Sequence, residues 1–450
     1  MRIRYAVAAL GGLGLMTTGL TTVAQADADG DRTTYIVVSN GGSLPARFEQ
    51  QVQRAGGTVT TAHPFGVAVV EAGPSFRGVA GTSTVVDSGF DVDLGPRVAL
   101  EARPENLPPA SGNDDTLFDL QWGHVPVGAV EAWEAGVRGA GVRVAVLDTG
   151  FDLDHPDLAP NIDLALSRDF TDEGLQYTLA DPFSHGTHVA GTIAAADNGI
   201  GVIGVAPEAE LVLVKVLEDE GSGAFEDIFA GIRHATEVDA DVINMSLGTV
   251  IPRNAAGNEV TQLANAMNRA ITYAHQQGTT VVVSAGNEAQ DLDGDGNLVR
   301  FMTSSPHAIG ISAYAPVGWL SDFWDGTFLV PTTYTNYGTS MVDFSGPGGD
   351  TAYPGEENCT VAGLTRPCWV FDLVFSTGSS LDPTVASYYW SGGTSMAAPH
   401  AAGVAALIIS EHGGDMKPAQ VEREMRLRAI DAGKPGTDDF HGRGAVHTGY

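Results

Sequence analysis

GVRVAVLDTG (residues 141–150) is a nearly continuous apolar run that ends on an aspartate, Asp148, followed by a glycine turn. A short apolar run bounded by a turn is typical of a β-strand that is buried on both faces, as strands of parallel sheets are. An aspartate at the end of such a strand is costly to bury unless it has a partner. Asp148 is therefore either a functional acid or a helix N-cap at the edge of a sheet.

Strand-like and helix-like segments alternate around this stretch. Such alternation predicts parallel βαβ units, and hence an α/β fold with a mostly parallel central sheet and helices on both faces. Sites in such sheets form beyond the carboxyl ends of the strands, where Asp148, Ser246 and Asn287 lie. The other strand patterns cover residues 209–219, 240–248 and 279–287, and the helix patterns cover 185–196, 224–237, 258–278 and 396–410.

The N-terminal part reads as export and processing sequence. Residues 1–26 have arginines at the start, an apolar stretch and a small-residue AQA ending, which predicts a signal peptide and a secreted, extracellular product with no membrane contact after its removal. Residues 27–110 hold a strand–helix–strand pattern, a small α+β unit, and then most of the Pro-, Asn- and Asp-rich linker 102–116. Residues 111–450 are expected to form the main domain.

The amino-acid composition limits the kinds of molecule that the chain is expected to bind. The chain has 23 Lys and Arg against 55 Asp and Glu, a net charge of −32, which disfavours nucleic acid and anionic membranes. It has two cysteines, Cys359 and Cys368. Outside the cytoplasm, a pair this close is expected to form a disulfide.

The tetrapeptide GTSM occurs twice, with its serine at position 340 and again at position 395. Ser395 precedes an Ala-rich apolar helix pattern, with Pro399 expected in the first turn, where no backbone N–H is lost. Free N–H groups and the positive dipole end at a helix start favour a developing oxyanion. Ser340 precedes a strand-like run and a Pro-Gly turn, so we interpret it as a loop serine.

A nucleophilic serine needs a base and an acid that orients the base. His185 is the best-placed base, because it comes at the start of the helix pattern 185–196, whereas His188 lies one turn further in and is expected to be packed. The two histidines also have the spacing of a metal pair, but the Glu of the usual zinc helix motif is absent. Asn287 ends a strand pattern, where its side-chain N–H can donate to an oxyanion.

Together these segments resemble the subtilisin-like serine proteases, the subtilases. The resemblance rests on five motifs in order, and the order Asp, His, Ser is that of subtilisin itself. It covers the chain from about Gln121 to the end. The motifs are VAVLDTG around Asp148, HGTHVAGT around His185, VINMSLG at 242–248, SAGN ending at Asn287, and GTSMAAPHAAGVAAL around Ser395.

The resemblance implies a serine endopeptidase that hydrolyses peptide bonds of proteins or peptides through an acyl-enzyme, with no cofactor required for the chemistry. It implies an Asp148–His185–Ser395 triad, with Asn287 and the Ser395 N–H as the oxyanion hole. Residues 33–100 resemble the family's prosegment, an inhibitor that a monomeric proenzyme removes itself, and we expect the cut in the linker between about Ala102 and Asp119. The implied substrate-binding residues are Ser246, Leu247, Gly248, Ala285 and Gly286.

The stretch between Asn287 and Ser395 is longer than in compact subtilases. It includes DLDGDGN (291–297), which has acids at loop positions 1, 3 and 5 and a glycine at 6, like a calcium loop. Position 12 is Met302 instead of Glu, so the alternative is a solvated acidic turn. The candidate calcium ligands are Asp291, Asp293 and Asp295.

Two rival functions remain at this point. VLDTG at Asp148 and VVDSG at Asp87 also resemble the aspartic-protease signature, in which two carboxylates activate water. The second rival is an inactive subtilase fold used for binding, although every catalytic position carries the competent residue. The sequence does not specify which side chains a substrate needs.

Overall fold

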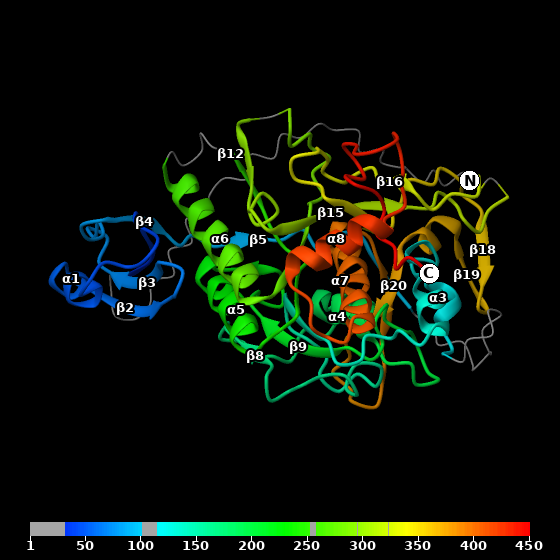
Figure 1. The fold of residues 1–450 in the computed structure, drawn as a ribbon. Helices are drawn as coiled ribbons and strands as arrows, with labels where there is room; N and C mark the ends of the chain where they lie inside the picture. The colour runs from blue at the N-terminus through cyan, green and yellow to red at the C-terminus, as the bar shows by residue number, and fades with distance from the viewer. Residues whose placement is uncertain (1–31, 101–114, 253–257, 295, 323) are drawn as a thin grey trace, which may run out of the picture.

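An eight-stranded sheet forms the centre of the molecule (Figure 1). The structure, a computed structural model, describes residues 32–100, 115–252, 258–294, 296–322 and 324–450. The sheet order is β16-β15-β13-β11-β7-β9-β8, β17 also pairs with β15, and every pair is parallel except β15 with β16. The predicted α/β fold with a mostly parallel sheet is confirmed. The strands are β7 (Arg143–Asp148), β8 (Arg168–Asp169), β9 (Glu210–Lys215), β11 (Val242–Met245), β13 (Thr280–Ser284), β15 (Ala308–Ala315), β16 (Val330–Pro331) and β17 (Phe344–Pro347).

Helices cover both faces of this sheet. Alternate residues of a strand point to opposite sides, and here the residues on both sides are apolar, so each face needs a covering layer. Val144 and Val146 of β7 belong to one apolar core, with α4 and α7. Ala145 and Leu147 belong to the other, with α5 and α6. The sheet is therefore buried on both faces, as its continuous apolar runs predict. The helices are α4 (His185–Ala194), α5 (Phe225–Glu237), α6 (Asn258–Gln277), α7 (Thr394–Glu411), and the shorter or terminal α2 (His124–Val127), α3 (Ala129–Glu134), α8 (Pro418–Arg428) and η1 (Phe118–Leu120).

The expected α+β unit is a four-stranded antiparallel sheet, in the order β2-β3-β1-β4, with one helix. Ile36 and Val38 from β1 and Val67 and Val69 from β3 share a core with α5 and α6. Figure 1 shows this unit at one end of the molecule, outside those two helices. Its elements are β1 (Thr33–Ser39), α1 (Phe48–Arg54), β2 (Gly57–Ala62), β3 (Val67–Ala72) and β4 (Thr82–Val86).

After β4 the chain runs along the main domain as two short strands. β5 (Phe90–Asp91) pairs antiparallel with β10 (Ser222–Gly223), and β6 (Arg97–Ala99) pairs antiparallel with β21 (Tyr388–Ser391). β21 also pairs with β20 (Val374–Thr377). The N-terminal unit is thus joined to the main domain by strand pairing as well as by packing. The predicted signal peptide and most of the predicted linker lie outside the described residues.

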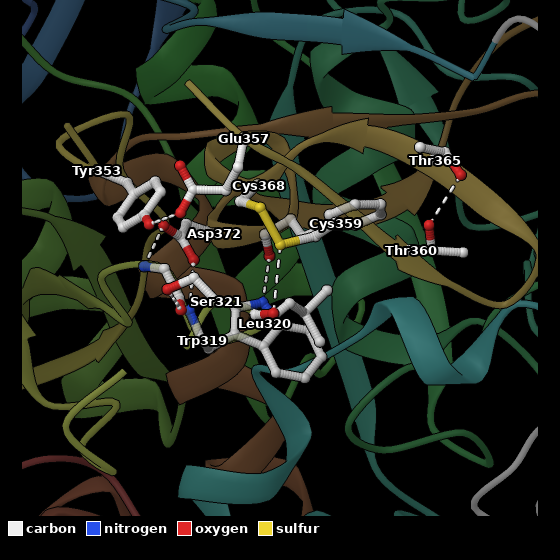
Figure 2. The surroundings of a disulfide bond; sticks show 12 residues. Trp319, Leu320, Ser321, Tyr353, Glu357, Cys359, Thr360, Thr365, Cys368 and Asp372 are labelled. Carbon is white, nitrogen blue, oxygen red and sulfur yellow. Dashed lines mark hydrogen bonds between the residues drawn. A yellow bond between two sulfur atoms is a disulfide. The ribbon is translucent and has the colours of Figure 1, made fainter. Parts of the chain in front are cut away.

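The longer stretch before Ser395 contains a hairpin that the cysteines close (Figure 2). The disulfide between Cys359 and Cys368 is present, as predicted. Beside it, the Asp372 carboxylate accepts N–H bonds from Gly318, at 2.7 Å, and Trp319, at 3.2 Å, which ties a neighbouring loop to the hairpin. The elements of this stretch are β14 (Leu298–Arg300), which pairs with β12 (Val250–Pro252), and β18 (Asn358–Val361), β19 (Leu364–Pro367) and η2 (Cys368–Asp372).

Within the residues that the structure describes, no helix is both long and apolar enough to cross a membrane.

Candidate active site

Asp148 and His185 form a buried hydrogen bond. His185 Nδ1 donates to Asp148 Oδ1 at 2.7 Å, and neither side chain is more than 1% exposed. Asp148 Oδ1 also accepts from the Thr149 N–H at 2.8 Å. Because Nδ1 carries the shared proton, the Nε2 lone pair of the neutral imidazole is left to accept a proton.

The start of α4 fixes the position of His185. Ser184 is the N-cap, and its Oγ accepts the Thr187 N–H at 3.1 Å and donates to the Gly150 carbonyl at 2.7 Å. The Gly186 N–H donates to Thr149 Oγ1 at 3.0 Å. Side-chain bonds therefore lock the first turn of α4 to the residues that follow β7. The N-cap Ser184 was not singled out in the sequence, although Ser before a small-residue helix is an N-terminus signal.

Ser395 lies at the start of α7 and contacts the end of the neighbouring strand β11. Its Oγ donates to the Ser246 carbonyl at 3.1 Å, and Ser246 Oγ donates to the Ser395 carbonyl at 2.8 Å. The helix begins at Thr394, so Pro399 is in its second turn, and the expectation of a first-turn proline was wrong. A proline there has no N–H for the Ser395 carbonyl four residues earlier, and that carbonyl accepts from Ser246 instead.

These contacts bring the three predicted triad residues to one edge of the sheet. Leu147 of β7 is in register with Met245 of β11. The next residue of each chain segment, Asp148 and Ser246, therefore lies on the same side of the sheet, and neighbouring strands are about 5 Å apart. No hydrogen bond joins His185 to Ser395 in the described residues, and His185 Nε2 has no partner there. In this structure the Ser395 hydroxyl donates to the Ser246 carbonyl instead of the imidazole.

Asn287 lies beside Ser395 with its amide held in one orientation. Asn287 Oδ1 accepts from Thr394 N–H and from Thr394 Oγ1, both at 2.9 Å. Thr394 Oγ1 in turn accepts the Gly286 N–H at 2.9 Å. With the amide oxygen occupied, Asn287 Nδ2 is the group left to donate toward an oxyanion. Thr394 was missed in the sequence, since nothing local marks it as a partner of a residue 107 positions away.

The other predicted substrate-binding residues lie at the ends of β11 and β13. Gly248 has a φ of +152° and lies three residues after β11, and Gly286 has a φ of +100° and lies two residues after β13. Ala285 and Gly286 are buried next to the start of α7. Leu247 is 1% exposed and belongs to the apolar core, so only its backbone is available to a ligand.

Comparison with known proteins agrees with this geometry. The family model described as Peptidase_S8, Subtilase family, matches residues 139–444, which is more than half of the chain. The chain belongs to the subtilase family. Members of this family are serine endopeptidases.

The relatives are proteases of similar sequence. The minor extracellular protease Epr of Bacillus subtilis (strain 168) is 28% identical over 402 residues, 82% of this chain and 52% of Epr. Subtilisin E of the same strain is 32% identical over 315 residues, 69% of this chain and 66% of its own. The chain thus spans about half the length of Epr, and what the whole relative does is not transferred by the match.

Solved structures show the same fold. The epidermin leader peptide processing serine protease EpiP from Staphylococcus aureus superposes with a TM-score of 0.72 at 19% identity, over 93% of this chain and 97% of its own. A protease from Pseudoalteromonas arctica superposes with a TM-score of 0.56 at 31% identity, over 75% of this chain and 97% of its own. The first likeness supports the architecture alone.

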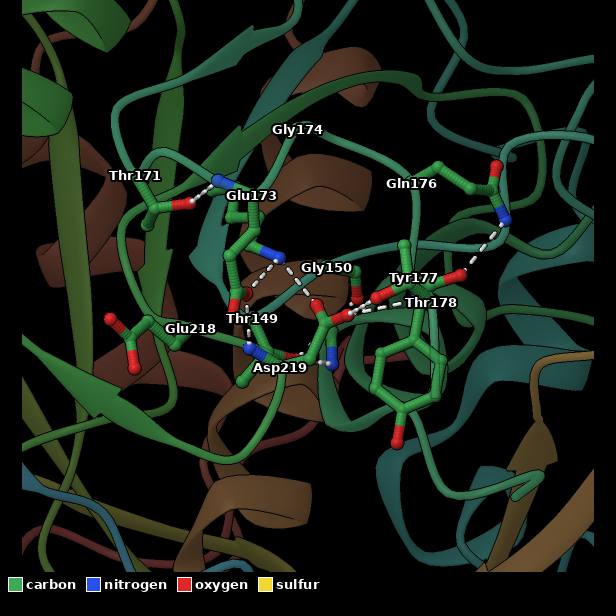
Figure 3. A network of polar contacts seen from close by, with 12 residues as sticks. Thr149, Gly150, Thr171, Glu173, Gly174, Gln176, Tyr177, Thr178, Glu218 and Asp219 are labelled. Carbon is green, nitrogen blue, oxygen red and sulfur yellow. Dashed lines mark hydrogen bonds and ion pairs between the residues drawn. The ribbon is translucent and has the colours of Figure 1, made fainter. Parts of the chain in front are cut away.

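A buried lysine at the end of β9 is in register with Asp148 of β7, and its carboxylate partners, Glu173 and Asp219, are labelled in Figure 3. Lys215 is fully buried and pairs with the carboxylates of Asp219 and of Glu173, the latter at 2.9 Å. Asp219 also accepts from Thr178 N–H and hydroxyl, both at 2.8 Å. A Cβ on Gly150 would lie 2.3 Å from Asp219 Oδ1 and 3.1 Å from Lys215 Nζ. The residue after Asp148-Thr149 must therefore be glycine.

The remaining histidine and serine candidates have structural roles. His188 is fully buried, bonds the Val374 carbonyl through Nε2 at 3.2 Å, and burial lowers its pKa to about 3. Ser340 is exposed, and its N–H donates to Asp293 Oδ1 at 3.1 Å. Neither residue takes part in the arrangement around Ser395, as the sequence predicted.

Carboxylates of the candidate calcium loop already accept N–H groups. Asp291 Oδ1 accepts from Asp293 at 3.0 Å and from Gly294 at 2.9 Å. Asp295 lies outside the described residues, and among those described no group of three or more His, Cys, Asp or Glu is arranged to hold a metal. A calcium ion in this loop stays a prediction.

The aspartic-protease reading pairs Asp148 with Asp87, and the two carboxylates have separate partners. Asp87 accepts the N–H groups of Phe225 at 3.2 Å and Glu226 at 2.9 Å, at the start of α5. Asp148 is bonded to His185. The family assignment and these contacts overturn that alternative.

Thr394→Val tests how far the orientation of the Asn287 amide depends on its hydrogen bond from the Thr394 hydroxyl. The change removes the hydroxyl that binds Asn287 Oδ1 and leaves the Gly286 N–H without its acceptor, a cost of about 1–3 kcal/mol per buried group. We expect kcat on a peptide amide to fall about 10–100-fold with KM little changed. Thr394→Ser keeps the hydroxyl and is expected to retain most of the rate. Equal kcat in all three proteins would contradict the positioning role.

Proposed function

We propose that the chain is a secreted serine endopeptidase that cleaves proteins or peptides through an acyl-enzyme at Ser395. The observation that carries this proposal is the buried bond from His185 to Asp148 beside a serine at a helix start. Secretion is supported by the signal-like N-terminus, by the disulfide and by the extracellular relative Epr.

The proposed chemistry follows from which atoms hold protons. Asp148 keeps the Nδ1 tautomer of His185, so Nε2 takes the proton of Ser395 Oγ as that oxygen attacks the peptide carbonyl. The same proton then passes to the leaving amine, and Asp148 stabilises the imidazolium formed between the two steps. Water repeats the sequence on the ester and releases Ser395.

The oxyanion would be bound by two donors. Asn287 Nδ2 is one, because its amide oxygen is held by Thr394. The Ser395 N–H is the other, because the second residue of a helix has no intrahelical acceptor for its N–H. In subtilisin itself the corresponding asparagine contributes about 10²–10³ in turnover, so this magnitude is a measured one from the same family.

The N-terminal unit would act as an inhibitory prosegment, because its exit strand crosses the site like a substrate. Val92 N–H donates to the Gly221 carbonyl at 3.0 Å beside β10, and Gly392 N–H donates to the Pro96 carbonyl at 3.2 Å beside β21. Gly392 is three residues from Ser395. The stretch from Val92 to Pro96 therefore runs from β10 to the residues just before Ser395. We place the self-processing cut there, upstream of the 102–119 range that the sequence suggested.

The prosegment is held to the main domain by apolar and charged contacts. His63 stacks on Phe65 at 4.8 Å and meets Phe229 of α5 at 6.2 Å between ring centroids. Burial, and then Arg233, lower the pKa of His63 to about 4. Burial raises the pKa of Asp87, which accepts N–H bonds from the start of α5.

Replacing Ser395 tests the proposed activity. Ser395→Ala is expected to lose about 10⁶-fold in kcat on a peptide amide, the size of loss measured for the nucleophile of subtilisin itself. Ser340→Ala is the matched control, since its tetrapeptide is identical and its contacts are with Asp293 in an exposed loop. We expect that control to stay within about twofold of the parent. Unchanged cleavage by Ser395→Ala, or a large loss in Ser340→Ala, would mean that the wrong serine has been chosen.

Sequencing the earliest processed product tests the cut. The first new N-terminus is expected between residues 93 and 96, and Ser395→Ala is expected to remain uncut. Inserting two residues into the linker should not move this first cut, because the linker does not set the β5 and β6 registers. An earliest product that starts between 103 and 119 would refute the placement.

At low pH, protonation of His63 is expected to weaken the binding of the prosegment to the main domain. Its pKa in the docked state is about 4, below the value near 6.5 of an exposed imidazole, so the docked form stays neutral while the free form gains a proton as pH falls. The stabilisation of the docked form is complete above pH 6.5 and is lost as pH falls toward 4. At pH 5 the affinity of the prosegment for the main domain is expected to be lower by up to about 30-fold.

The measurement is the release of activity from the processed, non-covalent complex at pH 7.5 and pH 5. His63→Phe keeps the ring contacts but does not titrate, so the acid-induced acceleration should be smaller than in the parent. Asp87, Glu226 and Asp227 have raised pKa values and act in the opposite direction, but they are the same in both proteins. The same pH ratio in both would contradict the assignment to His63.

A further inference from the structure

A buried arginine lies where the two strand ends beside the nucleophile meet. Arg300, the last residue of β14, is 3% exposed. A Cβ placed on Gly286 would lie 2.4 Å from its Cζ and 2.5 Å from Nη1, and a Cβ placed on Gly248 would lie 3.1 Å from Nη2. The guanidinium therefore spans from the end of β13 to the end of β11. Neither glycine can take a side chain without displacing it.

These strand ends flank Ser395. The Ser246 carbonyl accepts from Ser395 Oγ on the β11 side, and the Gly286 N–H donates to Thr394 on the β13 side. These strand ends carry the substrate-binding residues that the resemblance to subtilases implies, so the side chain on the acyl side of a bond attacked by Ser395 would lie between them. The charged groups next to these strand ends are the Arg300 guanidinium and its partner, the Glu288 carboxylate.

The guanidinium has donors that its protein partners do not use. Nη1 pairs with Glu288 Oε1 at 3.2 Å, and Nη2 reaches the Ser284 carbonyl only at 3.5 Å. Nε has no partner among the described residues. A guanidinium carries five N–H donors in a fork that fits a carboxylate. The Glu288 side chain is 37% exposed, so this partner is at the rim and the cation is inside.

We propose that Arg300 makes the enzyme favour an acidic side chain on the acyl side of the cleaved bond and disfavour a basic one. The inference rests on the proposed function and names its substrate class. A carboxylate entering between Gly248 and Gly286 gains charge-assisted bonds to a desolvated guanidinium. A lysine or arginine in the same place meets a like charge where water is excluded. Glu288 competes with an acidic substrate for Arg300 and partly attracts a basic one.

Two substitutions that are expected to change substrate preference in opposite directions test this proposal. The substrates are five peptide amides that are identical except for Glu, Asp, Gln, Leu or Lys at the acyl-side position. Arg300→Gln removes the cation, and we expect its Glu-to-Lys ratio of kcat/KM to fall about 10–100-fold. Glu288→Gln removes the competitor, and we expect that ratio to rise. Arg300→Lys keeps the charge without the fork and should lie between the parent and Arg300→Gln.

The Leu substrate separates the two proposals. If the parent cleaves the Leu peptide but its Glu-to-Lys ratio is below one, or all variants keep the ratio within twofold, Arg300 does not select substrates. If the parent cleaves none of the five, the proposed peptidase function itself fails. Should Arg300→Gln not fold, Arg300→Lys decides in its place, because Glu288→Gln removes a negative charge from the rim and would raise the ratio even if Arg300 did not select substrates.

Discussion

The hydrogen bond between Asp148 and His185 is the constraint on which the site depends. An aspartate that is fully buried at the end of a strand requires donors, and it obtains them from His185 and from the Thr149 N–H. That requirement fixes where α4 begins, and Ser184 and Thr149 hold the helix start in place. The parallel register of β7 with β11 then puts Ser246, and through it Ser395, beside the same edge.

Two buried cations, Lys215 and Arg300, also lie close to this site, although the chain as a whole is strongly acidic. Lys215 lies under the residues that follow Asp148, and Arg300 lies under the strand ends on the other side of Ser395. Each has a carboxylate partner, and each occupies the space that a Cβ on a nearby glycine would need, Gly150 for Lys215 and Gly286 for Arg300. Because interactions strengthen where water is excluded, these two charges act on the site more strongly than exposed ones would.

The sequence predicted the sheet, and the strand and helix ends that carry Asp148, His185 and Ser395, because these follow from local patterns. Apolar runs ending on Asp148 or Asn287, and a small-residue helix after Ser395, carry their signal within about ten residues. Thr394, Arg300 and the crossing strand were not predicted, because their roles come from pairing with residues far away in the chain. The turn assigned to Pro399 was wrong for a related reason, since the helix start is set by tertiary contacts of Thr394.

Covalent labelling tests the central claim most directly, because only a serine activated by its base reacts with a phosphonyl fluoride. The processed protein would be treated with such a reagent, digested and examined by peptide mass spectrometry, with His185→Ala treated in parallel. The account predicts one label, on Ser395, at a rate that collapses in His185→Ala. A label on Ser340, or equal labelling of Ser395 in both proteins, would contradict it.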